Sequence, residues 1–165
     1  MSILVIKDDD LKNLLIQITM KFKGFKDIDK PRSKVIEIFA DPKYLGEFQE
    51  GFIRKELVSG IEGQDGTISK MYYKHGKHDM ELTETITANR LPDTFEAHYH
   101  HIHMDNTMKC SFIALDDHKT RYEYEFEYTR INWFMPKLMA ILFPSAYRKP
   151  AEKWMNNFKT LVEKQ

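Results

Sequence analysis

The chain is poor in cysteine and has no excess of either charge. Cys110 is the only cysteine among 165 residues, so no disulfide bond can form within the chain. Such a composition is typical of a reducing compartment. Lys and Arg together number 25, as do Asp and Glu, which gives a formal net charge of zero. This balance excludes the strongly basic surface of a nucleic-acid-binding protein, so we expect no nucleic-acid partner.

Long hydrophobic runs are also absent. A membrane-spanning helix needs about 20 apolar residues, and the longest apolar segment, from Trp133 to Phe143, is about half that length and contains Pro136 and Lys137. No secretory signal is visible, because the first apolar run is short and three aspartates at 8–10 follow it. The sequence therefore predicts a cytoplasmic protein.

The common catalytic and cofactor motifs are missing as well. The chain has no G-x-S-x-G nucleophile motif, no H-E-x-x-H zinc motif and no pair of cysteines. Gly60, Gly63 and Gly66 lie between two expected strands and predict a hairpin loop. They are not a dinucleotide-binding motif, because no helix begins after them to hold a phosphate. We expect neither a cofactor nor a metal ion.

What the chain does have is enough apolar surface for one compact domain. Hydrophobic residues make up 42% of the sequence and aromatic residues 13%, and a chain of this length buries a sizeable core without disulfides or metal ions. The first residues differ in pattern from the rest. We interpret residues 1–17 as an N-terminal extension of uncertain structure and residues 18–165 as a single domain.

Alternation of apolar and polar residues predicts seven strands. The clearest is the last, in which Tyr122, Tyr124, Phe126 and Tyr128 alternate with charged residues. The connections are short, which favours an antiparallel meander. The expected strands cover residues 18–28, 52–59, 67–75, 78–89, 94–104, 107–115 and 120–130.

Helices are expected between the first two strands and at the end of the chain. Pro31 favours a first helical turn, and Asp41 followed by Pro42 favours a capped second helix. Residues 133–163 predict a long helix interrupted at Pro144 and Pro150. This helix must cover the apolar face of the sheet, and the space between the two would suit a small apolar ligand.

Several segments follow one another in a characteristic order: residues 30–39 with Asp41 and Pro42, 60–66, 81–86, 91–93, Thr120, 137–139 and 154–163. In this order they resemble the START-like, or SRPBCC, superfamily, in its polyketide cyclase/dehydrase branch. The resemblance covers about residues 18–164 and implies an α+β helix-grip fold, with a curved seven-stranded antiparallel sheet wrapped around a long C-terminal helix. It also implies a role in binding hydrophobic small molecules.

Glu84 is the first candidate for chemistry. It shares its strand face with Met80, Leu82 and Ile86, and a carboxylate among apolar neighbours is costly unless it is paired. It could orient a ligand hydroxyl or act as a general acid or base. Alternatively, it is a structural carboxylate bonded to a tyrosine hydroxyl or a basic side chain.

The second candidate is a group of histidines at positions 98, 100, 101 and 103. His101 and His103 share a face with Tyr99 and could line a cavity, or the group is an ordinary strand surface. A metal site is the least favoured reading, because zinc needs three or four ligands. The segment from Trp133 to Phe143, with Arg148 and Lys149 after it, would allow weak membrane contact.

Three functions remain open at this point. The first is binding or carrying a small lipid-, sterol- or polyketide-like molecule, oriented by Glu84 with His101 or a tyrosine hydroxyl. The second is a cyclase- or dehydratase-type enzyme in which Glu84 and a histidine, with His101 as the candidate, transfer protons. The third is a protein-interaction module with a filled core. The expected ligand-binding residues are Met71, Tyr73, Leu82, Glu84, Tyr99, His101, Phe112, Tyr124, Phe126, Met139 and Trp154.

Overall fold

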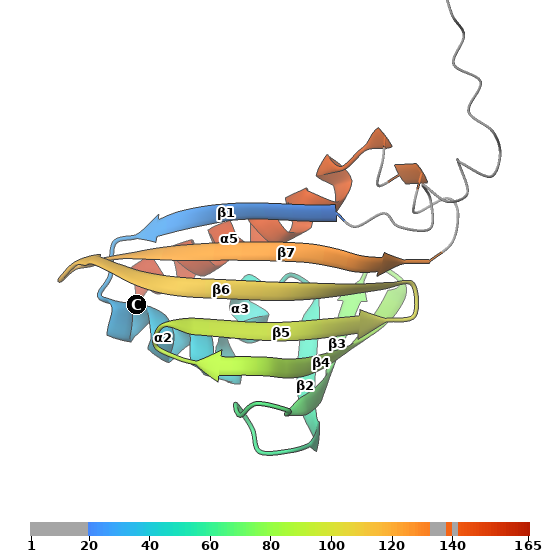
Figure 1. The fold of residues 1–165 in the computed structure, drawn as a ribbon, viewed down its shortest axis with the longest axis horizontal. Coiled ribbons are helices and arrows are strands. Elements are labelled where there is room, and N and C mark those ends of the chain that lie inside the picture. The colour runs from blue at the N-terminus through green and yellow to red at the C-terminus, as the bar shows by residue number, and fades with distance from the viewer. Residues whose placement is uncertain (1–19, 133–137, 140–141) are drawn as a thin grey trace, which may run out of the picture.

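A computed structural model describes residues 20–132, 138–139 and 142–165. The expected extension at 1–17 and the first two residues of the expected first strand lie outside the described residues. Seven strands form one antiparallel sheet in the order β1-β7-β6-β5-β4-β3-β2, so that β1 and β2 are its edges (Figure 1). The strands are β1 (Met20–Ile28), β2 (Phe52–Ser59), β3 (Ile68–His75), β4 (His78–Arg90), β5 (Thr94–His101), β6 (Met104–Asp116) and β7 (Lys119–Ile131).

Short helices connect β1 to β2. Helix α2 (Arg32–Ala40) begins directly after Pro31, and the 3-10 helix η1 (Pro42–Tyr44) leads into α3 (Leu45–Phe48). The Asp41 side chain accepts a hydrogen bond of 3.0 Å from the backbone N–H of Lys43, so the expected cap is present. Val35, Ile38 and Phe48 are buried and attach these helices to the sheet.

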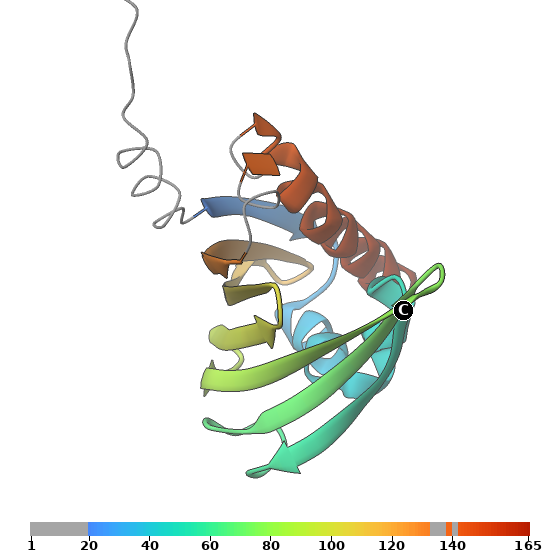
Figure 2. The same cartoon turned by 90° about the vertical axis from the view of Figure 1, so that its right-hand side faces the viewer.

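Helix α5 (Ser145–Lys164) closes the fold. The sheet curves strongly, and all the helices lie on its concave side (Figure 2). Met155, Phe158, Leu161 and Val162 are buried beneath α5. None of the helices that the structure describes is long and apolar enough to cross a membrane. The arrangement is the α+β helix-grip architecture that the sequence predicted.

The C-terminal half of α5 rests on an aromatic cluster. The Phe158 ring contacts the rings of Phe39, Phe48 and Tyr122 at centroid distances of 6.1, 5.1 and 5.5 Å. Phe112 stacks on Tyr122 at 4.9 Å with the ring planes 5° apart. These aromatic side chains pack the interior near α2.

The expected boundaries differ most from the structure at the β5–β6 turn and at the start of the last helix. The β5–β6 turn lies at Ile102 and His103, because His101 pairs directly with Met104, whereas the sequence predicted a turn at 104–106. The regular part of the last helix begins at Ser145, after Pro144, whereas the expected helix began at residue 133. Residues 133–137 and 140–141 of that expectation lie outside the described residues.

Candidate functional site

A cavity of about 850 Å³ lies between the concave face of the sheet and the N-terminal half of α5. Its wall is built mainly from apolar side chains of β3, β4, β5, β6 and β7, and α5 forms the opposite side. Exposed residues, among them Glu62, Lys149 and Lys153, also border it, so the cavity reaches the surface. The interior is therefore not the filled core that the protein-interaction hypothesis requires.

Methionine is prominent in this wall. Five of the nine methionines of the chain line the cavity. Their thioether side chains are flexible and polarisable, so the wall can adapt to the shape of a bound molecule. These residues are Met71, Met80, Met104, Met108 and Met155.

One row of cross-strand neighbours brings polar groups into the apolar wall. Ser69 of β3 is paired with Glu84 of β4, Glu84 with Tyr99 of β5, and Tyr99 with Asn106 of β6. Asn106 is in turn paired with Tyr128 of β7. Because side chains alternate between the faces of a strand, the whole row points to the concave side. All of these residues except Ser69 line the cavity.

Glu84 is buried and fully paired. Only 6% of its side chain is exposed, and its carboxylate accepts a hydrogen bond from the Lys55 ammonium at Oε2 and one of 3.1 Å from the Tyr99 hydroxyl at Oε1. Lys55 comes from the edge strand β2 and is itself only 16% exposed. Glu84 therefore has the contacts expected of a structural carboxylate, which bonds a tyrosine hydroxyl or a basic side chain. It also lines the cavity.

Two tyrosine hydroxyls of the wall are held as donors. Burial, together with the nearby Glu84 carboxylate, raises the pKa of Tyr99 well above its usual value. The same two causes raise the pKa of Tyr73, whose hydroxyl donates a hydrogen bond of 2.6 Å to Gln49 Oε1. The Tyr73 ring stacks on Trp154 of α5 with the centroids 5.7 Å apart. This contact joins the sheet to the helix across the cavity.

Most of the expected ligand-binding residues meet in this wall. Seven of the eleven line the cavity: Met71, Tyr73, Leu82, Glu84, Tyr99, Phe126 and Trp154. Four do not belong to its lining. Phe112 is part of the aromatic cluster under α2 and α5, and Met139 is 40% exposed.

Tyr124 and His101 also lie away from the cavity wall. Tyr124 leans over Gly24 of β1, where the missing side chain leaves room for its ring. The His101 ring lies 5.1 Å from that of His103 at the end of β5, and burial lowers its pKa. None of the histidines whose side chains the structure describes lines the cavity.

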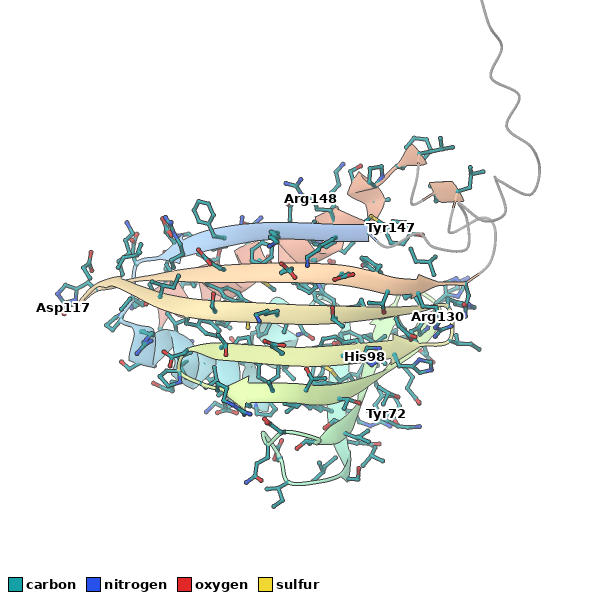
Figure 3. All side chains as sticks on the ribbon, viewed as in Figure 1. Tyr72, His98, Asp117, Arg130, Tyr147 and Arg148 are labelled. Carbon is teal, nitrogen blue, oxygen red and sulfur yellow. The ribbon has the colours of Figure 1, made fainter. Side chains whose placement is uncertain are left out.

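His100 belongs to an outer cluster instead. Its Nδ1 lies 2.6 Å from Asp105 Oδ1, and Arg130 donates hydrogen bonds of 2.6 and 2.8 Å to the two oxygens of the same carboxylate. Figure 3 shows Arg130 at the end of β7, close to the β5–β6 turn. Among the described residues, no three His, Cys, Asp or Glu side chains are arranged to hold a metal ion.

The expected membrane-contact segment is described only in part. Met139, Leu142 and Phe143 are exposed, and Tyr147 and Arg148 follow on the first turn of α5 (Figure 3). Tyr147 borders the cavity, whereas Arg148 is paired with Glu152 at 2.6 Å.

The solved structures to which this chain is similar share its fold at low identity. No family model and no curated protein matches the sequence. An aromatase/cyclase from Streptomyces, Zhui, is 11% identical with a TM-score of 0.72, over 88% of this chain and 94% of that one. A START superfamily protein from Mycobacterium smegmatis is 8% identical with a TM-score of 0.72, over 87% and 97%.

Norcoclaurine synthase from Thalictrum flavum, solved with dopamine and hydroxybenzaldehyde, is 14% identical with a TM-score of 0.66, over 100% of this chain and 98% of that one. At these identities the similarity establishes the fold and nothing about activity. The chain has the helix-grip fold of START-like (SRPBCC) proteins.

Proposed function

We propose that this protein binds or carries a small hydrophobic molecule, lipid-, sterol- or polyketide-like, in the cavity between the sheet and α5. The observation that carries the proposal is the cavity itself, with about 850 Å³ of space behind a mainly apolar wall. This volume lies within the range of ligand pockets, roughly 300–1,000 Å³. Apolar surface buried there would supply the affinity, at about 25 cal/mol per Å².

The few polar groups of the wall would orient the ligand. Glu84 with the Tyr99 hydroxyl, and Asn106 beside them, form a compact polar site on an apolar surface. Pockets that bind small molecules typically have this composition. The similar structures agree with the proposal, since one of them holds dopamine and hydroxybenzaldehyde and another is an aromatase/cyclase.

A matched pair of tryptophan variants tests the proposal. Leu82→Trp places an indole at a position in the cavity wall, and Ile113→Trp makes a similar change at an exposed position on β6. We expect the fluorescent apolar probe N-phenylnaphthylamine to bind the wild type and Ile113→Trp alike. Its affinity for Leu82→Trp should fall at least about tenfold, the equivalent of about 1.4 kcal/mol. Equal binding to all three folded proteins would contradict the proposal.

An enzyme is the second candidate function, favoured by the position of Glu84. A buried carboxylate that faces an apolar cavity and contacts a lysine and a tyrosine could transfer protons to a bound molecule. Tyr99 and Lys55 would then replace the expected histidine as its partners. Native mass spectrometry would first identify a molecule that co-purifies with the protein, and chromatography of that molecule after incubation with fresh protein would reveal conversion, including conversion to an isomer of equal mass. Conversion by the wild type but not by Glu84→Gln would favour the enzyme, and an unchanged molecule with both proteins would favour the carrier.

A further inference from the structure

The only ion pair deep inside the cavity wall, among the described residues, is Lys55 with Glu84. We propose that this pair makes the cavity select an uncharged ligand and reject anionic amphiphiles such as fatty acids. The inference rests on the proposed function and names the ligand class: an apolar molecule whose polar group is a hydroxyl, a phenol or a carbonyl.

The charges that border the cavity cancel. Its described lining contains three lysines and three glutamates and no other residue with a full charge at neutral pH. Lys153 is paired with Glu50 at 2.5 Å where both side chains are more than half exposed, and Glu62 and Lys149 are exposed as well. Water screens these outer charges, so they discriminate little between ligands. Lys55 and Glu84, at 16% and 6% exposure, are the charges that a buried ligand meets.

Both oxygens of the inner carboxylate already have partners. The Lys55 ammonium donates to Oε2 and the Tyr99 hydroxyl donates to Oε1. Among the described residues, no buried side-chain nitrogen or oxygen lacks a hydrogen-bond partner. The buried part of the wall therefore offers no spare positive charge to a carboxylate or sulfonate on a ligand, and Lys149 adds one only at the exposed rim.

An entering anion would face an unfavourable choice. It could lie beside the Glu84 carboxylate and be repelled, or it could take Lys55 from Glu84 and leave that carboxylate buried without its counter-ion. Breaking a buried ion pair in this way is strongly unfavourable, because an uncompensated charge stays in an apolar environment. A positively charged ligand group would be repelled by Lys55, or it would take Glu84 from Lys55 and leave the lysine ammonium buried without its counter-ion.

A neutral polar group avoids both costs. A hydroxyl can donate to a remaining lone pair of the carboxylate, since an ionised carboxylate offers about four acceptor sites. A carbonyl can accept from the Lys55 ammonium or from the Asn106 amide, which borders the cavity in the neighbouring strand. The ion pair then remains intact while the ligand is anchored.

Two fluorescent probes that differ by one charge test this selectivity. N-phenylnaphthylamine is neutral, and anilinonaphthalene sulfonate has the same aromatic skeleton with one sulfonate. We expect the wild type to bind the neutral probe at least about tenfold more tightly, a difference of about 1.4 kcal/mol. Only the component of probe binding that weakens in Leu82→Trp is assigned to the cavity.

Removing the negative member of the pair should remove most of the discrimination between the two probes. In Glu84→Gln the Lys55 ammonium becomes a buried cation without its carboxylate, so the ratio of neutral-probe to anionic-probe affinity should fall at least about tenfold. Glu81→Gln is the matched control. Glu81 lies on the same strand as Glu84 but forms an exposed ion pair with Lys70 of β3, so its loss should leave the affinity ratio unchanged. If Glu84→Gln does not fold, Lys55→Met/Glu84→Gln replaces the whole pair by neutral groups, and its ratio of neutral-probe to anionic-probe affinity should lie below that of the wild type.

The possible failures are distinguishable. No saturable binding of either probe to the wild type would overturn the proposed function. Binding of the neutral probe together with equal or tighter binding of the sulfonate, or an unchanged ratio in Glu84→Gln, would overturn the inference and leave the proposed function standing.

Discussion

At the scale of single residues, the contact between Tyr99 and Glu84 is the best-defined polar interaction of the cavity wall. Tyr99→Phe removes a buried donor from an ionised acceptor at 3.1 Å. Hydrogen bonds to charged groups contribute about 1.5–3 kcal/mol, so we expect the free energy of unfolding to fall by roughly 1–3 kcal/mol. Urea denaturation followed by circular dichroism measures the change.

Tyr72→Phe is the control for that measurement. The Tyr72 hydroxyl donates to Glu56 Oε2 over the same 3.1 Å, but in an exposed position. Water replaces such a hydrogen bond when it is lost, and we expect a change below about 0.5 kcal/mol. Similar losses in the two variants would show that the Tyr99–Glu84 pair is not shielded from water.

A second prediction for a single residue concerns the packing of Tyr124 against Gly24. A Cβ atom at this position would lie 2.6 Å from Cζ of the buried Tyr124 ring. Overpacking of this kind costs about 1–3 kcal/mol, so Gly24→Ala should lower the free energy of unfolding by that amount. The loss should shrink in a Tyr124→Leu background. Gly46→Ala, whose Cβ would make an ordinary 3.6 Å contact with Phe52, should be nearly neutral in thermal denaturation, and an equal loss there would contradict the packing argument.

The sequence could predict that Glu84 lies on the buried face of its strand, but not that Lys55 is its ion-pair partner. Strand parity places Glu84 on the apolar face, and the structure buries it there. Lys55 stands between Arg54 and Glu56, a pattern typical of a solvated strand, and only the pairing of β2 with β3 turns it inward beside Met71. Such a contact between strands far apart in sequence leaves no local signal.

At the scale of elements, the β5–β6 hairpin is held to β7 by the Asp105 carboxylate. Hydrogen bonds from Arg130 lower the pKa of Asp105 to about 2; burial opposes this shift, and a further hydrogen bond from His100 supports it. An unfolded aspartate has a pKa of about 3.9, so the stabilisation is present above that pH and is lost as the pH falls toward 2.

Asp105→Asn should therefore be less stable than the wild type at pH 7, and the difference should shrink steadily between about pH 5 and pH 2. Chemical denaturation at four pH values across this range measures it. Asp93→Asn is the control, because its carboxylate is 73% exposed and contacts Arg32 only at the surface. A stability difference for Asp105→Asn that is independent of pH would contradict the assignment.

The same hairpin shows why element boundaries were only partly predictable. Asp105 and Asn106 are typical turn residues, and the sequence therefore placed the turn at 104–106. In the structure they are paired within β6, because Asp105 bonds Arg130 and Asn106 continues the polar row next to Tyr99. By contrast, β2 was predicted with the bounds that it has, since Gly51 and Gly60 flank it with positive φ angles.

At the scale of the whole molecule, the curved sheet and α5 determine what the protein can hold. The aromatic cluster around Phe158 fixes the C-terminal half of the helix, so that its N-terminal half spans the cavity. The sequence predicted this architecture, because seven alternating strands and one long helix have few compact arrangements. It could not predict the volume that remains, which depends on how far the large side chains near α2 fill the interior.

The most direct test of the account uses the methionines as reporters. NMR spectra of protein labelled with carbon-13 at the methionine methyl groups, recorded during titration with N-phenylnaphthylamine, locate the bound probe. We predict large, saturable shifts for the methyl groups that line the cavity, Met71, Met80, Met104, Met108 and Met155, and smaller ones for Met20 and Met139. Shifts confined to Met20 and Met139, or no saturable shift at any methionine, would contradict the claim that the space beneath α5 is a ligand site.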